Sequence, residues 1–316
     1  MKELINKVTV TGVLVKNGIE EFTTKKGNEA IGGDLILRTA DDSEHQISFF
    51  AHKYKKDENG NFTSELGYFY EKYLDAKNNL KDIEHTADDE KPDIISISDG
   101  KFEANDFKSQ DGNVISNNKI TAKFINRVEP KDYDSTILEA KFEVEGIIES
   151  IKDEIVKNVP TGNLIVTLNA IKQNQTDFKN DNSYEVDVLV PIKMTVDKSM
   201  ANAFRTAGYY DGCYAKFVGT LINTAEIVET VEKQNFGEDI VRKVKTYIRK
   251  NEIKSGSSVS TIFEHDLNQE VVDALIAKRK QTLIEIKNGV VSKNNSTDDG
   301  KETQAPPTTY NPFAQN

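Results

Sequence analysis

The residues best suited to chemistry are cations that alternate with an aromatic ring in the second half of the chain. Residues 242–249 read RKVKTYIR, and in a β-strand successive side chains point to opposite faces. One face would then carry Lys243, Lys245, Tyr247 and Arg249. Lysine and arginine neutralise phosphates and tyrosine stacks on bases, so the pattern is typical of a groove for one nucleic-acid strand. The alternative is a protected sheet edge, because lysine at an edge discourages aggregation.

Further cations and rings fit the same chemistry. Tyr214 and Lys216 are expected to face outward from the preceding strand. In the first half, alternation with Ile47 and Phe49 puts Phe50 on the outside of its strand; the alternative is that Phe50 packs on the helix that follows. The remaining candidates for nucleic-acid binding are Lys53, Phe107, Lys119, Lys123 and Arg127.

The overall charge argues against a general basic field. The chain has 316 residues and a net charge of -11, so nucleic-acid binding requires the cations to gather on one face. The length predicts about two domains. The sequence contains one cysteine and neither an apolar run of membrane-spanning length nor a signal-peptide pattern. We therefore expect a cytoplasmic protein, in the host cytoplasm if it is phage-encoded, that does not bind membranes.

No pattern in the sequence predicts catalysis. The four histidines lack the paired spacing of zinc ligands, and Gly32-Gly33 is not followed by the Lys-Ser or Lys-Thr of a phosphate loop. The acidic run at 88–90 is a weak candidate for magnesium, but a solvated acidic loop is the simpler interpretation. We expect no catalytic residue, no metal and no cofactor, and a protein that is not an enzyme.

The hydrophobic periodicity predicts a mainly β protein in which one pattern occurs twice. In the first half, strands are expected near 7–14, 32–39, 45–51, 101–107 and 119–128, with a helix at 68–83. In the second half, strands are expected near 142–148, 162–168, 184–190, 212–222 and 240–249, with a helix at 199–207. Five strands with a helix between the third and fourth is the order of the OB-fold, a small closed barrel.

The predicted organisation is therefore two tandem OB-fold-like five-stranded barrels, then a C-terminal helix and a disordered tail. The first OB-fold domain is placed at 1–133 and the second at 134–256. A helical segment follows at 257–289. The tail at 290–316 consists of Asn, Ser, Thr, Asp, Gly, Pro and Gln with few apolar residues, and this composition does not support a packed core.

Several short motifs resemble those of the bacterial and phage single-stranded-DNA-binding proteins. The resemblance rests on Ile5-Asn6-Lys7-Val8 leading to Gly12, Phe49-Phe50-Ala51, Gly100 with Phe107 and Asp111-Gly112, and Pro312-Phe313 near the end of the tail. It implies OB-fold barrels that bind single-stranded DNA, and a tail whose tip binds other proteins. The chain departs from the family in having no tryptophan, in a mildly acidic tail that continues three residues past Phe313, and in its second barrel. These departures favour a diverged, phage-encoded relative.

The tail ends in a tip of two rings and a proline: Tyr310, Pro312 and Phe313. On a disordered tether such a tip searches for partners at a high effective concentration. We expect it to recruit replication, recombination or repair proteins; the alternative is a frayed terminus without a function.

Two classes of function stay open at this stage. The first is a non-enzymatic, sequence-tolerant protein that binds and protects single-stranded DNA. The second is a β-rich phage adaptor or assembly protein whose barrels bind other proteins. A nuclease is a distant third. The oligomeric state, the footprint on a strand and the preference for DNA or RNA do not follow from the sequence.

Overall fold

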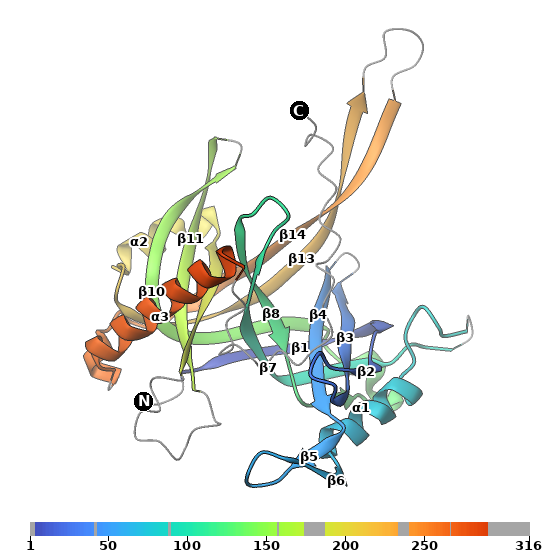
Figure 1. Cartoon of the computed structure of the whole chain (residues 1–316). Coiled ribbons are helices and arrows are strands. Elements are labelled where there is room, and N and C mark those ends of the chain that lie inside the picture. Colours follow the sequence, from blue (N-terminus) through green and yellow to red (C-terminus); the bar gives the residue numbers. More distant parts are fainter. Residues whose placement is uncertain are drawn as a thin grey trace.

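The computed structural model describes residues 4–40, 43–87, 90–156, 158–173, 187–232, 240–265 and 267–289, without the side chains of 225–232 and 240–247. The fold is mainly β. One twelve-stranded sheet closes on itself twice and forms two barrels that lie side by side (Figure 1).

The first barrel has five principal strands and one helix. The strands are β1 (Asn6–Asn17), β3 (Glu29–Ala40), β4 (Ser43–His52), β7 (Ile94–Lys108) and β8 (Val114–Thr121). They pair in the closed order β1-β3-β4-β8-β7-β1, in which only β4 and β8 are parallel. Helix α1 (Tyr68–Asn79) lies between β4 and β7 in the chain. The shorter elements are β2 (Glu20–Thr23), β5 (Tyr54–Lys56), β6 (Phe62–Leu66), β9 (Asn126–Arg127) and the 3-10 helix η1 (Pro130–Ser135).

The second barrel repeats this order. Its strands are β10 (Glu139–Val156), β11 (Val159–Lys172), β12 (Val188–Val196), β13 (Tyr214–Glu232) and β14 (Ile240–Gly256). They close as β10-β11-β12-β14-β13-β10, again with one parallel pair, β12 and β14. Helix α2 (Lys198–Thr206) lies between β12 and β13. The predicted fold class, two OB-fold-like barrels followed by a C-terminal helix, is confirmed.

Alternating hydrophobicity explains why these segments form barrels. Val8, Val10 and Leu14 of β1 are fully buried, while Thr9, Thr11 and Val13 on the other face are half-buried. Gly12 interrupts this row at a close backbone approach, because a Cβ at this position would lie 2.8 Å from the carbonyl oxygen of Arg38. A strand that bends around a small barrel favours glycine at such a point.

Each helix closes one end of its barrel with aromatic packing. Tyr73 of α1 meets Phe49 with ring centroids 5.5 Å apart, and Phe204 of α2 meets Phe217 at 5.9 Å. Edge-to-face and tilted pairs of this kind add to the stability gained by burying their area. Phe49 therefore belongs to the core, which leaves its neighbour Phe50 on the outer face of β4.

The two barrels share backbone and core contacts. Strands β1 and β10 pair from Asn6 opposite Val144 to Thr11 opposite Glu139, and Thr224 of β13 pairs with Ser43 of β4. Buried residues of both barrels form one continuous hydrophobic cluster. The domain boundaries expected from the sequence stay a prediction.

Helix α3 (Gln269–Lys287) follows the second barrel and the 3-10 helix η4 (Ile262–His265). Its Val272 and Leu275 join Ile147, Ile171 and Leu189 in a second buried cluster. The side chain of Asn268 caps the helix by accepting a hydrogen bond from the Glu270 N–H at 2.8 Å. Within the described residues, no helix combines the length and apolar character needed to span a membrane.

Candidate functional site

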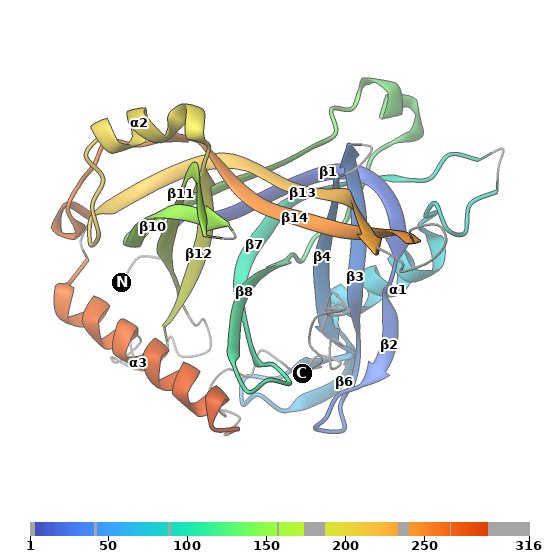
Figure 2. The same cartoon turned by 90° about the horizontal axis from the view of Figure 1, so that it is seen from above.

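A groove of about 1850 Å³ runs between the two barrels. Its walls are formed mainly by residues of β3, β4, β7 and β8 on one side and of β10, β11, β12, β13 and β14 on the other, and α3 contributes a third wall. The second to fifth strands of each barrel are therefore all represented. Figure 2 shows β13 and β14 running from the second barrel toward the first, with the β7–β8 hairpin between the barrels. Equivalent faces of both barrels thus border one site.

The groove is basic although the chain is acidic. Its described lining holds ten Lys or Arg residues and five Asp or Glu residues, whereas the whole chain has a net charge of -11. The ten cations are Lys16, Lys101, Lys119, Lys123, Lys172, Lys193, Arg249, Lys250, Arg279 and Lys280. This separation of charge answers the objection raised by the net charge, because local potential steers a charged ligand more than total charge does.

Six of these cations are available for a ligand. Within the described part of the chain, they have no carboxylate within 4.0 Å: Lys119, Lys123, Lys193, Arg249, Lys250 and Lys280. By contrast, Lys16 pairs with Glu84 at 3.2 Å and Lys172 pairs with Glu103 at 2.6 Å.

One of the five lining acids, Glu154, is already engaged within the second barrel. It accepts hydrogen bonds from Thr161 Oγ1 at 2.7 Å and Asn163 Nδ2 at 2.9 Å. The bond from Thr161 is the main cause that lowers the pKa of Glu154, and the charges of Lys250 and Lys193 lower it further. This carboxylate therefore stays ionised close to two of the available cations.

Two rings on the first barrel are presented to the groove. Phe50 of β4 and Phe22 of β2 are half-buried, line the groove and lie 6.2 Å apart between ring centroids. The nearby Gly32 is opposite Phe50 in the β3–β4 ladder and has no side chain to cover the ring. A flat base can stack on such an open aromatic surface.

A buried histidine lies in the same wall. His45 of β4 lines the groove, is 3% exposed, and its Nε2 is 3.1 Å from Thr39 Oγ1 and 3.2 Å from Ser43 Oγ. Burial lowers the pKa of His45 to about 4. The imidazole is therefore neutral near pH 7 and adds no charge to the groove.

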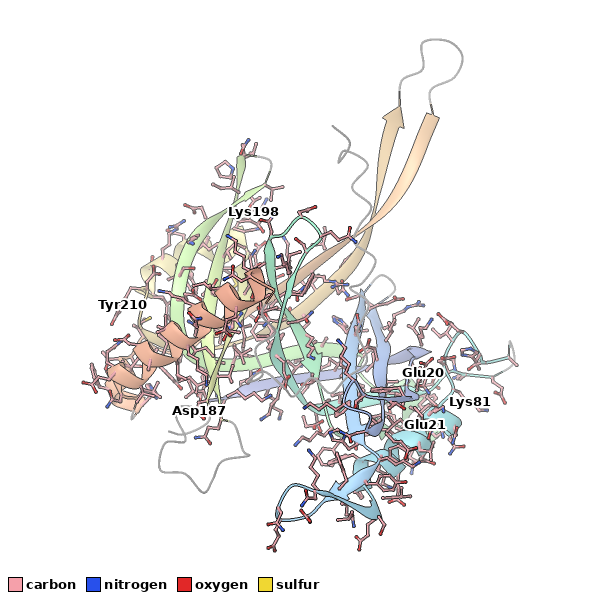
Figure 3. The ribbon with its side chains drawn as sticks, viewed as in Figure 1. Glu20, Glu21, Lys81, Asp187, Lys198 and Tyr210 are labelled. Carbon is pink, nitrogen blue, oxygen red and sulfur yellow. The ribbon has the colours of Figure 1, made fainter. Side chains whose placement is uncertain are left out.

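Two acidic side chains of β2 lie outside the described groove lining. Figure 3 shows Glu20 and Glu21 beside α1. Glu21 accepts hydrogen bonds from Tyr70 Oη at 2.5 Å and Lys77 Nζ at 3.0 Å, so it ties β2 to α1. The bond from Tyr70 is the main cause that lowers the pKa of Glu21. Part of the negative charge is thus used structurally, away from the groove.

Helix α3 crosses from one barrel to the other. Its first half packs on the second barrel, and further along Arg279 makes a bidentate ion pair with Asp106 of β7 and donates to Ser116 Oγ at 3.0 Å. The side chains of Arg279 and Asp106 are 12% and 4% exposed. This pair fixes the third wall, where Ile276, Lys280 and Leu283 face the groove.

The structure brings four of the predicted binding residues together: Phe50, Lys119, Lys123 and Arg249 all line the groove. The side chains of Lys243, Lys245 and Tyr247 lie outside the described residues, and so do Tyr310, Pro312 and Phe313 of the tail. The predicted roles of these six in binding DNA or partner proteins stay predictions, as do the roles of the four groove residues.

Five predicted residues lie away from the described groove lining. Phe107 is half-buried on β7, beyond the groove. The cations among the five are engaged elsewhere: Lys53 pairs with Glu29 at 2.7 Å, Arg127 with the buried Asp93 at 2.7 Å, and Lys216 with Glu143. The fifth is Tyr214.

The expected exposure of Tyr214 is wrong. Its side chain is 4% exposed and its ring stacks on His265, with centroids 3.5 Å apart. The strand alternation does put Tyr214 on the outer face of the barrel. However, η4 and α3 cover that face, and Tyr214 packs with Ile262 and Leu267. Burial raises the pKa of its hydroxyl well above the usual range.

Sequence reasoning did not assign three of the available cations to a binding face. Lys193 alternates with the buried Ile192 and Met194, so the same period-two argument could have identified it. Lys250 directly follows Arg249, the last residue of the binding face predicted on β14. Lys280 lies on a helix whose position depends on the contact between Arg279 and Asp106, which no local pattern predicts.

The described residues contain no group of three or more His, Cys, Asp or Glu side chains placed to hold a metal ion. The described groove lining combines cations, five acids, neutral polar side chains and aromatic and aliphatic surface.

Comparison with known proteins gives a family and several structures. A family model described as YorF matches residues 4–289. The wild-type single-stranded DNA binding protein from Thermus aquaticus is similar with a TM-score of 0.45 and 12% identity, over 81% of this chain and 94% of that chain. A deletion mutant of that protein is similar with a TM-score of 0.45 and 14% identity, over 82% of this chain and 96% of that chain. A replication protein A heterotrimer bound to single-stranded DNA is similar with a TM-score of 0.21 and 14% identity, over 89% of this chain and 53% of that chain. No curated protein matches the chain.

Proposed function

This chain belongs to the YorF family, and we propose that its groove binds single-stranded DNA with little sequence preference and without catalysis. The observation that carries the proposal is the excess of ten cations over five acids in one groove of an acidic protein. Cations that neutralise phosphates release condensed counterions, and this release drives binding whatever the base sequence.

The aromatic residues favour a single strand over a duplex. Phe22 and Phe50 offer faces on which only unpaired, unstacked bases can lie. Stacking contributes about 1–3 kcal/mol per base and accepts every base. A duplex keeps its bases inside and would contact the groove through phosphates alone.

The six available cations set the expected salt dependence. If each contacts one phosphate, log K falls with log[salt] with a slope of about -4, since each contact contributes about 0.7 for a single strand. Fluorescent oligo-dT should be titrated at two salt concentrations, with the matching duplex and oligo-U as further ligands. Tight, salt-dependent binding of oligo-dT supports the proposal, and the absence of affinity at low salt overturns it.

We further propose that the tail recruits proteins to the bound strand. Tyr310 and Phe313 supply two apolar anchors, and Pro312 reduces the entropy lost when the tip docks. The proposed partners are enzymes of replication, recombination or repair. Binding would take place in the cytoplasm, and in that of the host cell if the protein is phage-encoded. Deletion of 310–316 should leave affinity for DNA intact and abolish capture of a polymerase, primase or helicase; unchanged capture would contradict this part.

One observation favours the adaptor alternative. The β10–β11 hairpin ends in exposed apolar residues, with Ile155 62% exposed, Val156 50% and Val159 64%. Such a tip could bind a protein partner. The adaptor function predicts no binding of oligo-dT at low salt, so the same titration separates the two proposals.

A further inference from the structure

A row of rings leads out of the groove along the first barrel. Phe22 lies 6.2 Å from Phe50, Phe50 lies 5.0 Å from His52, and His52 lies 4.9 Å from Phe62 between ring centroids. Phe22 and Phe50 line the groove, whereas Phe62 is on strand β6, beyond the described lining. We call these four residues the ring row; it extends an aromatic surface from the groove onto a separate element.

That element is the β5–β6 hairpin, a two-stranded sheet separate from the twelve-stranded one. Its turn is well defined: Asp57 accepts hydrogen bonds from the backbone N–H groups of Asn59 and Asn61, both at 2.9 Å. Gly60 has a φ of 84°, which favours glycine. The hairpin is also attached at its base, where Gly67 N–H donates to the Lys53 carbonyl at 2.8 Å.

The hairpin presents a ring and a cation together. Phe62 is 36% exposed, and the Lys56 Nζ lies 4.9 Å from the centroid of its ring. In the described part of the chain Lys56 has no carboxylate partner, whereas the neighbouring Lys55 is paired with Glu65 at 3.0 Å. A ring with an available cation beside it is the combination that binds one base and its phosphate.

We propose that the ring row and Lys56 form a second stacking subsite, which takes the bases of a strand as it leaves the groove at the first barrel. This inference rests on the proposed binding of single-stranded DNA. A purely structural role for Phe62, in which it anchors the hairpin to His52, accounts for the ring contact. It does not account for the exposed ring surface.

The absence of tryptophan from the sequence gives a direct test. Phe62→Trp places one indole fluorophore on the ring row, and Tyr210→Trp is the matched control. Tyr210 is 52% exposed and lies on the outside of the second barrel, near α2 (Figure 3). Saturation with oligo-dT of about 40 nucleotides, longer than the range expected for two barrels, should quench the indole of Phe62→Trp and leave the emission of the control unchanged.

A second variant measures the contribution to affinity. Phe62→Ala should weaken binding of the same oligonucleotide about five-fold or more, whereas Leu66→Ala on the same hairpin should leave it within about two-fold of wild type, roughly the scatter of a surface substitution. Circular dichroism and thermal melting identify variants that fail to fold. If Phe62→Ala is one of them, the fluorescence of the tryptophan variants alone tests the proposal.

The outcomes separate the two proposals. If wild type binds no oligonucleotide, the proposed function itself fails. If wild type binds, but Phe62→Trp keeps its full emission at saturation and Phe62→Ala binds as tightly as wild type, the groove stands and the subsite is wrong.

Discussion

The two barrels contribute equivalent strands to one groove but different chemistry. The first barrel supplies rings, with Phe22 and Phe50 beside Lys119 and Lys123. Among the described residues that line the groove, the second barrel supplies cations, two acids, neutral polar groups and aliphatic side chains, and no aromatic ring. Its available cations are Lys193, Arg249 and Lys250.

This difference shows how a duplicated fold divides a task. The closed strand order decides which face borders the groove, and it is the same in both halves. The side chains on that face decide what is bound. We infer that the first barrel stacks bases and also contacts phosphates through Lys119 and Lys123, whereas the described side chains of the second barrel contact phosphates. Loss of a ring and loss of cations should therefore change different parameters of binding.

The largest expected effect concerns the ion pair that fixes helix α3, the third wall of the groove, to the first barrel. Arg279→Ala leaves Asp106, 4% exposed, without its partner. Breaking a buried ion pair costs about 3–5 kcal/mol, so the free energy of unfolding in urea should fall by that amount. Ser116→Ala, which removes only the neighbouring 3.0 Å hydrogen bond, is the control and should cost about 1 kcal/mol. A loss below that of the control would mean that the pair does not hold α3.

Next in size is the removal of the second barrel's cations. The triple variant Lys193→Ala, Arg249→Ala and Lys250→Ala should weaken binding of oligo-dT about 100-fold at low salt, taking about 1 kcal/mol for each lost phosphate contact. The salt slope should fall in magnitude by about 2, from three contacts at about 0.7 each.

The control for this variant removes equal charge from outside the described groove lining: Lys131→Ala, Lys152→Ala and Lys198→Ala. An equal loss of affinity in both triple variants would show that overall charge, and not the groove, governs binding. The division between the barrels would then be wrong.

A smaller effect is expected from the rings of the first barrel. Phe50→Ala should cost about 1–3 kcal/mol of binding free energy through lost stacking, and the salt slope should stay unchanged because no phosphate contact is lost. Phe50→Tyr keeps the ring and should bind nearly as wild type. A change in slope for Phe50→Ala would contradict the assignment of bases to this barrel.

The sequence predicts the barrels well because their signal is local. Alternation in β1, β4 and β11 determines which side chains enter a core, and the succession of strands and helices along the chain matches that of the OB-fold. For the same reason the outward position of Phe50 could be derived once Ile47 and Phe49 were assigned to the core. The tie between β1 and β10 involves segments far apart in the sequence, such as Asn6 and Val144, and no period in either segment reveals it.

The site was harder to predict than the fold because a groove between barrels depends on such distant contacts. Tyr214 was placed on the correct face of its strand, yet η4 and α3 cover that face. Arg127 and Lys53 were named as binding cations, but their partners Asp93 and Glu29 lie far away in the sequence. Alternation indicates that a side chain leaves the core; it does not indicate what meets it there.

The smallest expected effect concerns pH and arises from one residue of the first barrel. The pKa of His45 is lowered to about 4 by burial, below the value of about 6.5 expected in the unfolded chain. The unfolded state therefore binds a proton first as pH falls, so stability is lost between about pH 6.5 and 4. By about pH 5.5 the loss should be about 1 kcal/mol.

Urea denaturation at about pH 7.5 and 5.5 should show this loss for wild type and a loss about 1 kcal/mol smaller for His45→Gln, because glutamine does not titrate. The second barrel lines the groove with Lys193, Arg249 and Lys250, and lysine and arginine keep their charge over this range. Acidification should therefore weaken the first barrel while the salt slope of DNA binding stays constant. An equal pH dependence in wild type and His45→Gln would show that His45 is not the group that titrates.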